Sequence, residues 1–148
     1  MLAKFYRNIV RAYEVIKVSA YLASVWTFQE WLHFWTTFDK ETIINVKEIK
    51  LVVRTGNIFS KATDISMIYE CIVRDDYKIN SLSNKNGSII DVGAHLGSFS
   101  LFASKKCPKC KIYSFEPSPS TYAVLKKNIE LNQSGNIIIF NKAVTSGS

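Results

Sequence analysis

The chain has 148 residues, a length that allows one domain with a substantial core but not two large ones. Hydrophobic residues make up 47% of it, charged residues 21% and aromatic residues 13%, which excludes a wholly disordered protein. The formal net charge is +7, yet the basic residues are scattered and form no run of five or six. We therefore interpret them as a solvated surface and expect no nucleic-acid partner.

Residues 1–40 are expected to form an N-terminal helical segment. One face of it is apolar at helical spacing, through Phe5, Ile9, Tyr13, Ile16 and Ala20, with Trp26, Trp31 and Trp35 adding bulk. We favour a helix packed on its own domain over a helix that rests on a membrane surface or a partner. The longest charge-free stretch of this segment, residues 18–29, is too short to span a bilayer, and no signal-peptide cleavage site is apparent.

Residues 41–86 are expected to form a smaller segment with a strand and a helix. The β-branched residues from 44 to 53 predict one strand, and Gly56 in the turn after it could take a positive φ. Thr63 is the predicted N-cap of a short helix. The apolar face of that helix would consist of Ile65, Ile68 and Ile72. The polar stretch 80–88 is the predicted boundary with the next segment.

Residues 87–148 change to an alternation of strands and helices. Strands are predicted at 89–92, 111–115 and 136–140, and helices at 98–106 and from Ser118-Pro119 to about Asn132. The order β-α-β-α-β predicts an α/β fold with a parallel sheet and right-handed crossovers.

The three cysteines are too few for a disulfide framework in a chain of this length. Cys107-Pro-Lys-Cys110 is a lone CxxC, and Cys71, His33 and His95 show no spacing that would complete a zinc site. We expect two incidental thiols in a loop, no metal, and a reducing, cytoplasmic setting.

The stretch from Asp91 to Gly97 points to a ligand. It reads Asp-Val-Gly-Ala-His-Leu-Gly and follows the first strand of the α/β segment, where ligands of such sheets bind. Gly93 and Gly97 would let the backbone approach the ligand closely, and the next helix would offer free N–H groups to an anion. Glu116 ends the second strand, where a carboxylate can accept hydrogen bonds from both hydroxyls of a ribose.

The spacing of this loop selects among nucleoside cofactors. A dinucleotide fingerprint is G-x-G-x-x-G, which D-x-G-x-x-x-G does not match. An aspartate at the turn would repel a pyrophosphate but suits a ligand with an amino group or a sulfonium. S-adenosylmethionine carries both cations, together with a carboxylate for the helix N-terminus. We therefore expect S-adenosylmethionine rather than NAD.

At family level, three blocks of the sequence closely resemble the FkbM family of class I S-adenosylmethionine-dependent methyltransferases. They are "IIDVGAHLGSFSLFASK", "KIYSFEPSPSTYAVLKKNIELN" and "IIIFNKAV". The segment "VVRTGNIFSKATDISMIYECIVRDDY" is similar to the family's sequence before the first strand, with an arginine, Asp64, Glu70 and Tyr77 in order. The resemblance covers about residues 50–148 and implies a Rossmann-like class I fold.

The resemblance also implies roles for individual residues. Those that would hold the methionine end of the cofactor lie in the loop and are Asp91, Gly93, Ala94, His95 and Gly97. Glu116 would bind the ribose, and Lys142 and Ala143 would lie beside the adenine. His95 could donate a hydrogen bond to the ligand or serve only the turn. Asp64 and Tyr77 could cover the cofactor entrance, although a half-buried aromatic is the preferred interpretation of Tyr77.

Class I methyltransferases have seven strands in the order 3-2-1-4-5-7-6, and we expect this chain to be a fragment that stops after the third. The family implies O-methylation of a sugar, polyketide or other small molecule, but the sequence nominates no catalytic base. Two alternatives are a non-catalytic module that keeps the shape of a nucleotide site and, less favoured, a membrane-surface protein that uses the aromatic N-terminal helix.

Overall fold

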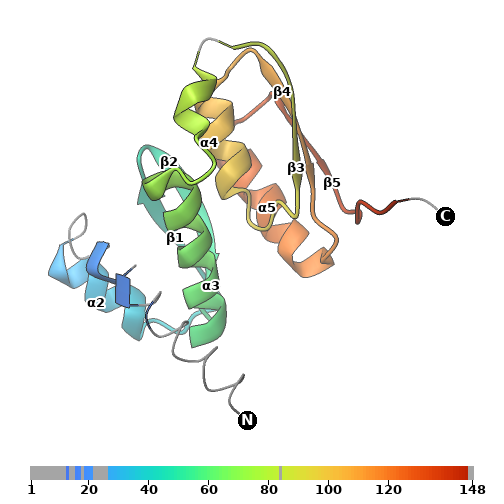
Figure 1. Cartoon of the computed structure of the whole chain (residues 1–148). Coiled ribbons are helices and arrows are strands. Elements are labelled where there is room, and N and C mark those ends of the chain that lie inside the picture. Colours follow the sequence, from blue (N-terminus) through green and yellow to red (C-terminus); the bar gives the residue numbers. More distant parts are fainter. Residues whose placement is uncertain (1–12, 14–15, 18, 22–26, 84, 147–148) are drawn as a thin grey trace.

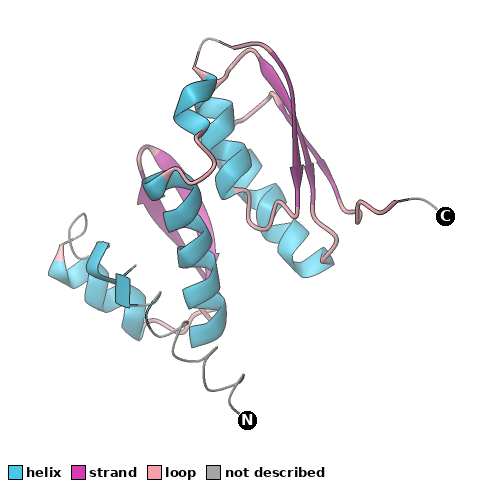
Figure 2. Ribbon diagram, in the orientation of Figure 1, coloured by secondary structure: helices cyan, strands magenta, loops and turns pink. Residues whose placement is uncertain are grey.

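The computed structural model describes residues 13, 16–17, 19–21, 27–83 and 85–146. These residues form a two-stranded antiparallel sheet and a three-stranded parallel sheet. Helices α4 (Ser98–Lys106) and α5 (Pro119–Leu131) lie between the parallel sheet and the antiparallel hairpin, so that only one face of the parallel sheet is covered by helices (Figures 1 and 2).

The N-terminal segment is helical wherever it is described before residue 22, and it continues in α2 (Phe28–Thr36). Phe5, Ile9 and Trp26 of the expected apolar face lie outside the described residues. Tyr13 and Ile16 are 56% and 65% exposed, so this part of the face does not pack on the domain as favoured from the sequence. None of the helices in the described ranges is long and apolar enough to cross a membrane.

The single strand predicted for residues 44–53 is wrong, because the chain turns back on itself within that range. Strand β1 (Glu41–Val46) pairs antiparallel with β2 (Ile49–Arg54) in a register that places Val46 opposite Ile49. The two residues between them, Lys47 and Glu48, have φ of 45° and 66°. Two consecutive residues at positive φ form the tight turn that suits a hairpin, but lysine and glutamate are not the residues that announce one.

The helix after the hairpin begins earlier than predicted. Helix α3 (Ile58–Ile68) is capped by Asn57, whose side chain accepts a hydrogen bond from the N–H of Ser60 at 2.9 Å. Thr63 therefore lies inside the helix, and Gly56 is not among the residues with positive φ. The expected apolar face is confirmed, since Ile65, Ile68 and Ile72 are all buried. A π-helical turn η1 (Tyr69–Arg74) and a 3₁₀ turn η2 (Ile79–Leu82) follow.

The α/β segment is the part that the sequence predicts best. Strands β3 (Gly87–Val92), β4 (Cys110–Phe115) and β5 (Ile137–Phe140) pair in parallel in the order β3-β4-β5. Ser118 accepts a hydrogen bond from the N–H of Thr121 and Pro119 is the first helical residue of α5, as expected. A class I sheet of order 3-2-1 needs these three strands in this arrangement, so the predicted Rossmann-like α/β fold is confirmed.

The backbone N–H and C=O groups on the outer edge of β2 form hydrogen bonds with side chains instead of with another strand. Asn132, the C-cap of α5, accepts a hydrogen bond from the N–H of Lys50 (3.0 Å), and Asn128 on α5 accepts one from Val52 (2.6 Å). Asp64 on α3 accepts one from the N–H of Arg54 (2.8 Å). Asn132 also donates to the carbonyl of Lys50, and Asn128 donates to the carbonyl of Val52. An open strand edge is a liability, and these contacts close it. They also fix the hairpin to the helices of the α/β segment.

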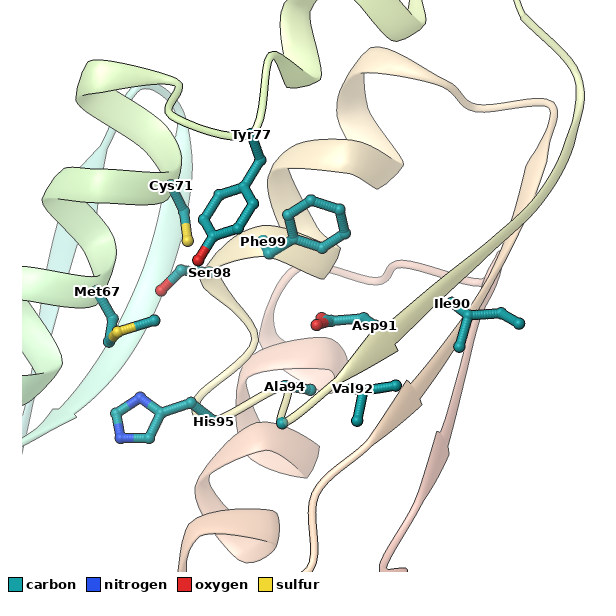
Figure 3. Close-up of a pocket in the computed structure, with 11 residues that line it drawn as sticks. Met67, Cys71, Tyr77, Ile90, Asp91, Val92, Ala94, His95, Ser98 and Phe99 are labelled. Carbon is teal, nitrogen blue, oxygen red and sulfur yellow. The ribbon is translucent and has the colours of Figure 1, made fainter. Parts of the chain in front are cut away.

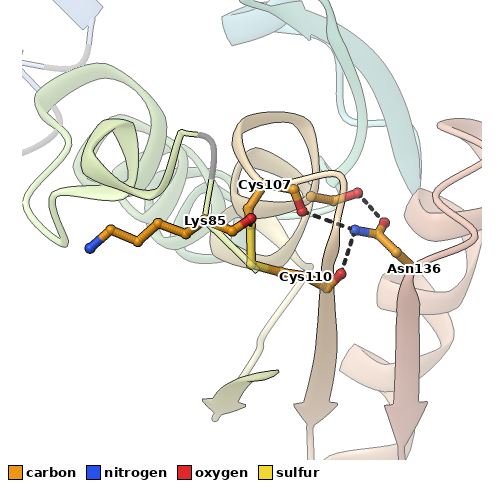
Figure 4. The surroundings of a disulfide bond; sticks show 5 residues. Lys85, Cys107, Cys110 and Asn136 are labelled. Atoms are coloured by element: carbon orange, nitrogen blue, oxygen red, sulfur yellow. Dashed lines mark hydrogen bonds between the residues drawn. A yellow bond between two sulfur atoms is a disulfide. The ribbon is translucent and has the colours of Figure 1, made fainter. Parts of the chain in front are cut away.

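The amino end of the parallel sheet contains a disulfide between Cys107 and Cys110, so the expectation of two incidental thiols is wrong (Figure 4). The turn between the two cysteines brings their Cα atoms to 5.3 Å, within the range that a disulfide requires. Asn136 donates from its side-chain amide to the carbonyls of Cys110 (3.0 Å) and Cys107 (3.4 Å) and accepts from Ser104 Oγ (2.5 Å). Disulfides are typical of oxidising compartments, so cysteine usage no longer supports the cytoplasmic expectation, which stays a prediction.

Candidate functional site

The loop after β3 turns sharply and leaves open space at its first glycine. Gly93 has φ of 78°, and no atom would lie within 4 Å of a Cβ built there. The N–H groups of Gly93 and Ala94 both donate to the carbonyl of Phe115, each at 2.9 Å, so the loop is tied to the end of β4. Gly93 therefore has the conformation and the free space that close approach of a ligand requires.

Gly97 is needed for packing, which differs from the role that the sequence indicated. Its φ is 92°, and a Cβ there would lie 2.7 Å from Leu125 Cδ1 on α5. The absent side chain thus lets the start of α4 contact α5 directly. Because Gly97 is buried against the protein, the structure gives it a structural reason that is independent of any ligand.

Asp91 lies on β3 with its carboxylate directed toward α4 and is partly buried. It accepts a hydrogen bond from Ser100 Oγ at 2.5 Å, and Ser100 in turn lies 2.6 Å from Ser114 Oγ. Burial raises the pKa of Asp91 above its usual value, and the nearby Glu116 adds to this, while the hydrogen bond from Ser100 opposes it. A cationic group bound beside Asp91 would favour the ionised carboxylate again, so the position suits an ammonium.

Glu116 follows β4 and is only 6% exposed. One of its carboxylate oxygens accepts the N–H of His95 and the other the N–H of Ser118, each at 2.9 Å. The side chain therefore joins the β3 loop to the N-cap of α5. Each oxygen keeps a second lone pair, so this bridging is compatible with the ribose role that the sequence predicts.

His95 is held by charged residues from the hairpin and α3. Its backbone is left-handed (φ 53°), and its Nε2 lies 2.8 Å from Arg54 Nη2 and 3.6 Å from Asp64 Oδ1. Burial lowers the pKa of His95, and Arg54 lowers it further, whereas Asp64 and Glu116 act in the opposite direction. The Nδ1 atom is buried and is one of three buried side-chain N or O atoms without a partner in the described part of the chain.

A pocket of about 220 Å³ is lined by Asp91, Gly93 and His95 but not by Gly97 or Glu116 (Figure 3). Further lining residues come from the end of α3, the segment after α3 and the start of α4, and include Met67, Tyr77 and Ser98. Figure 3 shows Tyr77 above the loop, where its ring meets that of Phe99 edge-on at 5.5 Å between centroids. Tyr77 is 56% exposed, so it is more open than the half-buried aromatic that we preferred.

The remaining predicted residues are not all at this pocket. Asp64 is fully buried under the Arg54 guanidinium and does not line the pocket, while Lys142 and Ala143 lie exposed after β5. Ser98 was not identified from the sequence. It is 3% exposed, it lines the pocket and its Oγ also has no partner, a property that depends on tertiary packing and leaves no local signal.

The parallel sheet with its glycine loop and following carboxylate is the cofactor half of a class I methyltransferase. Two solved structures share this fold: M. jannaschii TYW2 in complex with AdoMet (24% identity, TM-score 0.55, 69% of this chain and 43% of that chain) and P. horikoshii TYW2 in complex with MeSAdo (22%, 0.57, 71% and 37%). The family model described as the TRM5/TYW2 methyltransferase domain matches residues 59–145, more than half of the chain. The chain belongs to this family.

The predicted enzyme class and cofactor, a methyltransferase domain dependent on S-adenosylmethionine, are thereby confirmed, whereas the FkbM family is not shown. The motifs that suggested FkbM are those predicted to bind the cofactor, and such motifs do not separate families that differ in their acceptors.

Two curated proteins are related to the chain in sequence. "Methyltransferase sdnD" of Sordaria araneosa is 42% identical over 91 residues, which is 61% of this chain and 35% of that protein. "Methyltransferase 1" of Beauveria bassiana (strain ARSEF 2860) is 42% identical over 44 residues, or 30% of this chain and 18% of that protein. The chain thus spans about a third of the length of the first relative and less of the second.

Proposed function

We propose that the complete protein is an S-adenosylmethionine-dependent methyltransferase that methylates a hydroxyl group of a small molecule, such as a sugar or a polyketide. The observation that carries the cofactor part is the pocket at the carboxyl end of β3. It combines an open turn at Gly93, a partly buried carboxylate at Asp91 and the start of α4, whose first-turn N–H groups suit an anion. These groups fit a ligand with both an ammonium and a carboxylate.

The roles proposed for the chain's residues follow from these positions. Asp91 would bind the amino group of the methionine moiety, and the loop from Gly93 to Gly97 would follow its backbone. Glu116 would accept the ribose hydroxyls while keeping the loop in place through its bonds to His95 and Ser118. Lys142 and Ala143 would lie beside the adenine, for which their exposed position after β5 leaves room.

The chemistry follows from holding acceptor and methyl group in contact. Bound S-adenosylmethionine supplies an electrophilic methyl group, and the acceptor oxygen displaces the sulfur in line. The chain's contribution is orientation, which provides a large part of the acceleration in reactions of this type. The hydroxyl proton needs a base, and no described residue is nominated for that step.

A second acceptor class, tRNA, is favoured by the family match, since relatives of the TRM5/TYW2 type act on tRNA. The net charge of +7 is compatible with it. We rank the small molecule first because the basic residues are scattered along the sequence and form no run that would suit a nucleic acid.

The experiment is a methyl-transfer assay on the complete protein with S-adenosylmethionine labelled in the methyl group. Small hydroxylated metabolites and total tRNA are offered as separate acceptors. Label in the small molecules supports the proposal, and label in tRNA alone replaces its acceptor part.

The cofactor part is tested in the same preparation by equilibrium dialysis. Glu116→Gln should weaken cofactor binding about tenfold or more, because a hydrogen bond to a charged group is lost. Glu130→Gln is the matched control on the exposed face of α5. Equal affinity of the two variants would remove Glu116 from the ribose role.

A further inference from the structure

A second hollow lies where α4 ends and β4 begins, and we call it the lysine hollow. Its volume is about 260 Å³, and four of its six lining residues are lysines. Lysine and arginine make up only 19 of the 148 residues of the chain, so this lining is strongly enriched in positive charge. The lining consists of Ser83, Lys85, Lys105, Lys106, Pro108 and Lys109. None of these six residues lines the cofactor pocket.

The four lysines come from three separate segments of the chain. Lys105 and Lys106 lie in the last turn of α4. Lys109 lies in the turn before β4, and Lys85 lies in the loop before β3. Cations at a helix C-terminus interact favourably with the helix dipole, which explains the first pair without a ligand. The dipole does not explain Lys85 and Lys109, because neither belongs to a helix.

The disulfide-bonded turn holds the backbone that carries Lys109. This residue lies between the two cysteines, and Asn136 donates hydrogen bonds to the carbonyls of both (Figure 4). Cys107 Sγ also lies 3.0 Å from the carbonyl oxygen of Lys85, whose side chain extends away from the disulfide (Figure 4). The turn therefore positions Lys109 and contacts the backbone of Lys85.

The positive charges of the lysine hollow are only partly neutralised. Lys105 Nζ donates to the carbonyl of Glu48 at 2.5 Å and lies 3.8 Å from the carboxylate of the same residue. Lys85, Lys106 and Lys109 form no ion pair with a carboxylate in the described part of the chain. Like charges that lie close together repel each other and oppose folding. Three such cations around one hollow therefore point to an anionic ligand.

The residue types and the shape of the hollow narrow the class of anion. A lysine ammonium is a compact point charge that binds phosphate, whereas bidentate recognition of a carboxylate is typical of arginine. A hollow suits a compact group better than the extended backbone of a nucleic acid. The six lining residues include no large apolar side chain that would enter a membrane surface. Several adjacent lysines suit several adjacent phosphates.

We propose that Lys85, Lys106 and Lys109 bind a ligand with two or three linked phosphate groups, at a site separate from the cofactor pocket. Lys105 adds positive charge while it holds the end of α4 against the hairpin. The nine residues of α4 run from the cofactor pocket to the lysine hollow, a length of about 13 Å. Both sites can therefore be occupied at the same time, and this site does not depend on the proposed methyl transfer.

The test is calorimetric titration of the complete protein with inorganic triphosphate at low ionic strength. One triphosphate should bind per chain, and its affinity should fall as salt is added, because exposed charges are screened. Replacing two lysines together, Lys85→Gln and Lys109→Gln, should weaken binding about tenfold or more. The matched control is Lys40→Gln with Lys126→Gln, which removes the same charge at two exposed positions outside the hollow. The control should retain the affinity within about twofold.

Two further ligands identify the source of the phosphates. Binding of uridine triphosphate tighter than that of inorganic triphosphate supports a nucleotide, and equal binding supports the phosphate chain alone. Binding of total RNA without binding of triphosphate overturns the proposal, as does equal triphosphate affinity in the lysine variant and its control. The affinity for S-adenosylmethionine should be the same in both variants, so failure of this site leaves the proposed function intact.

Discussion

The two ends of the parallel sheet differ in how completely their polar groups are satisfied. At the amino end, Asn136 holds the carbonyls of Cys107 and Cys110, and the disulfide covers the turn. At the carboxyl end, Asp91 is partly buried with a raised pKa, and the buried atoms His95 Nδ1 and Ser98 Oγ have no partners among the described residues. Buried polar groups are normally hydrogen-bonded, so the difference marks the amino end as structural and the carboxyl end as the place where a ligand completes the structure.

The largest expected effect is a loss of stability at Gly97, which lies at the carboxyl end of the sheet but has a packing role. Gly97→Ala should lower the free energy of unfolding of the complete protein by about 3 kcal/mol, because the new Cβ meets Leu125 and the backbone is left-handed. Urea denaturation measures it. Gly135→Ala, at an open position with no positive φ, is the control and should change stability by less than about 0.5 kcal/mol. A tolerated alanine at 97 would return Gly97 to the ligand role.

A somewhat smaller effect is expected at the amino end. Asn136→Ala leaves two carbonyls and the Ser104 hydroxyl without their partner and should cost about 2 kcal/mol of stability. Affinity for S-adenosylmethionine, measured by calorimetry at a temperature where the variant is folded, should stay the same. Asn86→Ala in the exposed loop before β3 is the control. A large loss of affinity in Asn136→Ala would mean that the two ends are coupled.

Asp91→Asn should separate stability from binding. Since its pKa is raised in the folded protein, ionisation of Asp91 at neutral pH opposes folding, and the neutral amide should stabilise the ligand-free protein by up to about 1 kcal/mol. The same change should weaken cofactor binding about tenfold or more through loss of the ammonium contact. Thermal melts with and without cofactor measure both, with the exposed Asp39→Asn for comparison. Loss of stability without loss of affinity would contradict the assignment.

The smallest effect is a pH dependence from His95. Its pKa is lower in the folded than in the unfolded protein, so the unfolded state takes up the proton first as the pH falls. The free energy of unfolding should therefore decrease as the pH falls below about 6.5, by at most about 1.4 kcal/mol per pH unit. Asparagine tolerates a left-handed backbone, so His95→Asn should fold in the same way. It should reduce the pH dependence of the free energy of unfolding in denaturant titrations between pH 7 and 5. An unchanged slope would show that His95 is not the group responsible.

Local signals explain which parts of the fold could be predicted. The start of α5 was predicted correctly because two adjacent residues, Ser118 as N-cap and Pro119 as first helical residue, are enough to indicate it. The hairpin turn at Lys47 and Glu48 was missed because neither residue favours the left-handed conformation that the pairing of β1 with β2 imposes. The division at residues 40 and 86 stays a prediction.

The site shows the same limit. Asp91 and Gly93 could be predicted because the spacing of the loop after the first strand is typical of a cofactor site. Glu116 could be predicted because it ends the second strand. The contact of Gly97 with Leu125 and the link from Arg54 to His95 join residues 28 and 41 positions apart, and no local pattern records such contacts. Ser98 likewise became visible only once its burial was known.

The central claim is that the carboxyl end of the sheet is completed by a cationic, adenosine-bearing methyl donor. Calorimetric titration of the complete protein with S-adenosylmethionine and, separately, with NAD⁺ tests it most directly. One S-adenosylmethionine should bind per chain while NAD⁺ gives no heat of binding. Preference for the dinucleotide, or binding of neither, would contradict the account.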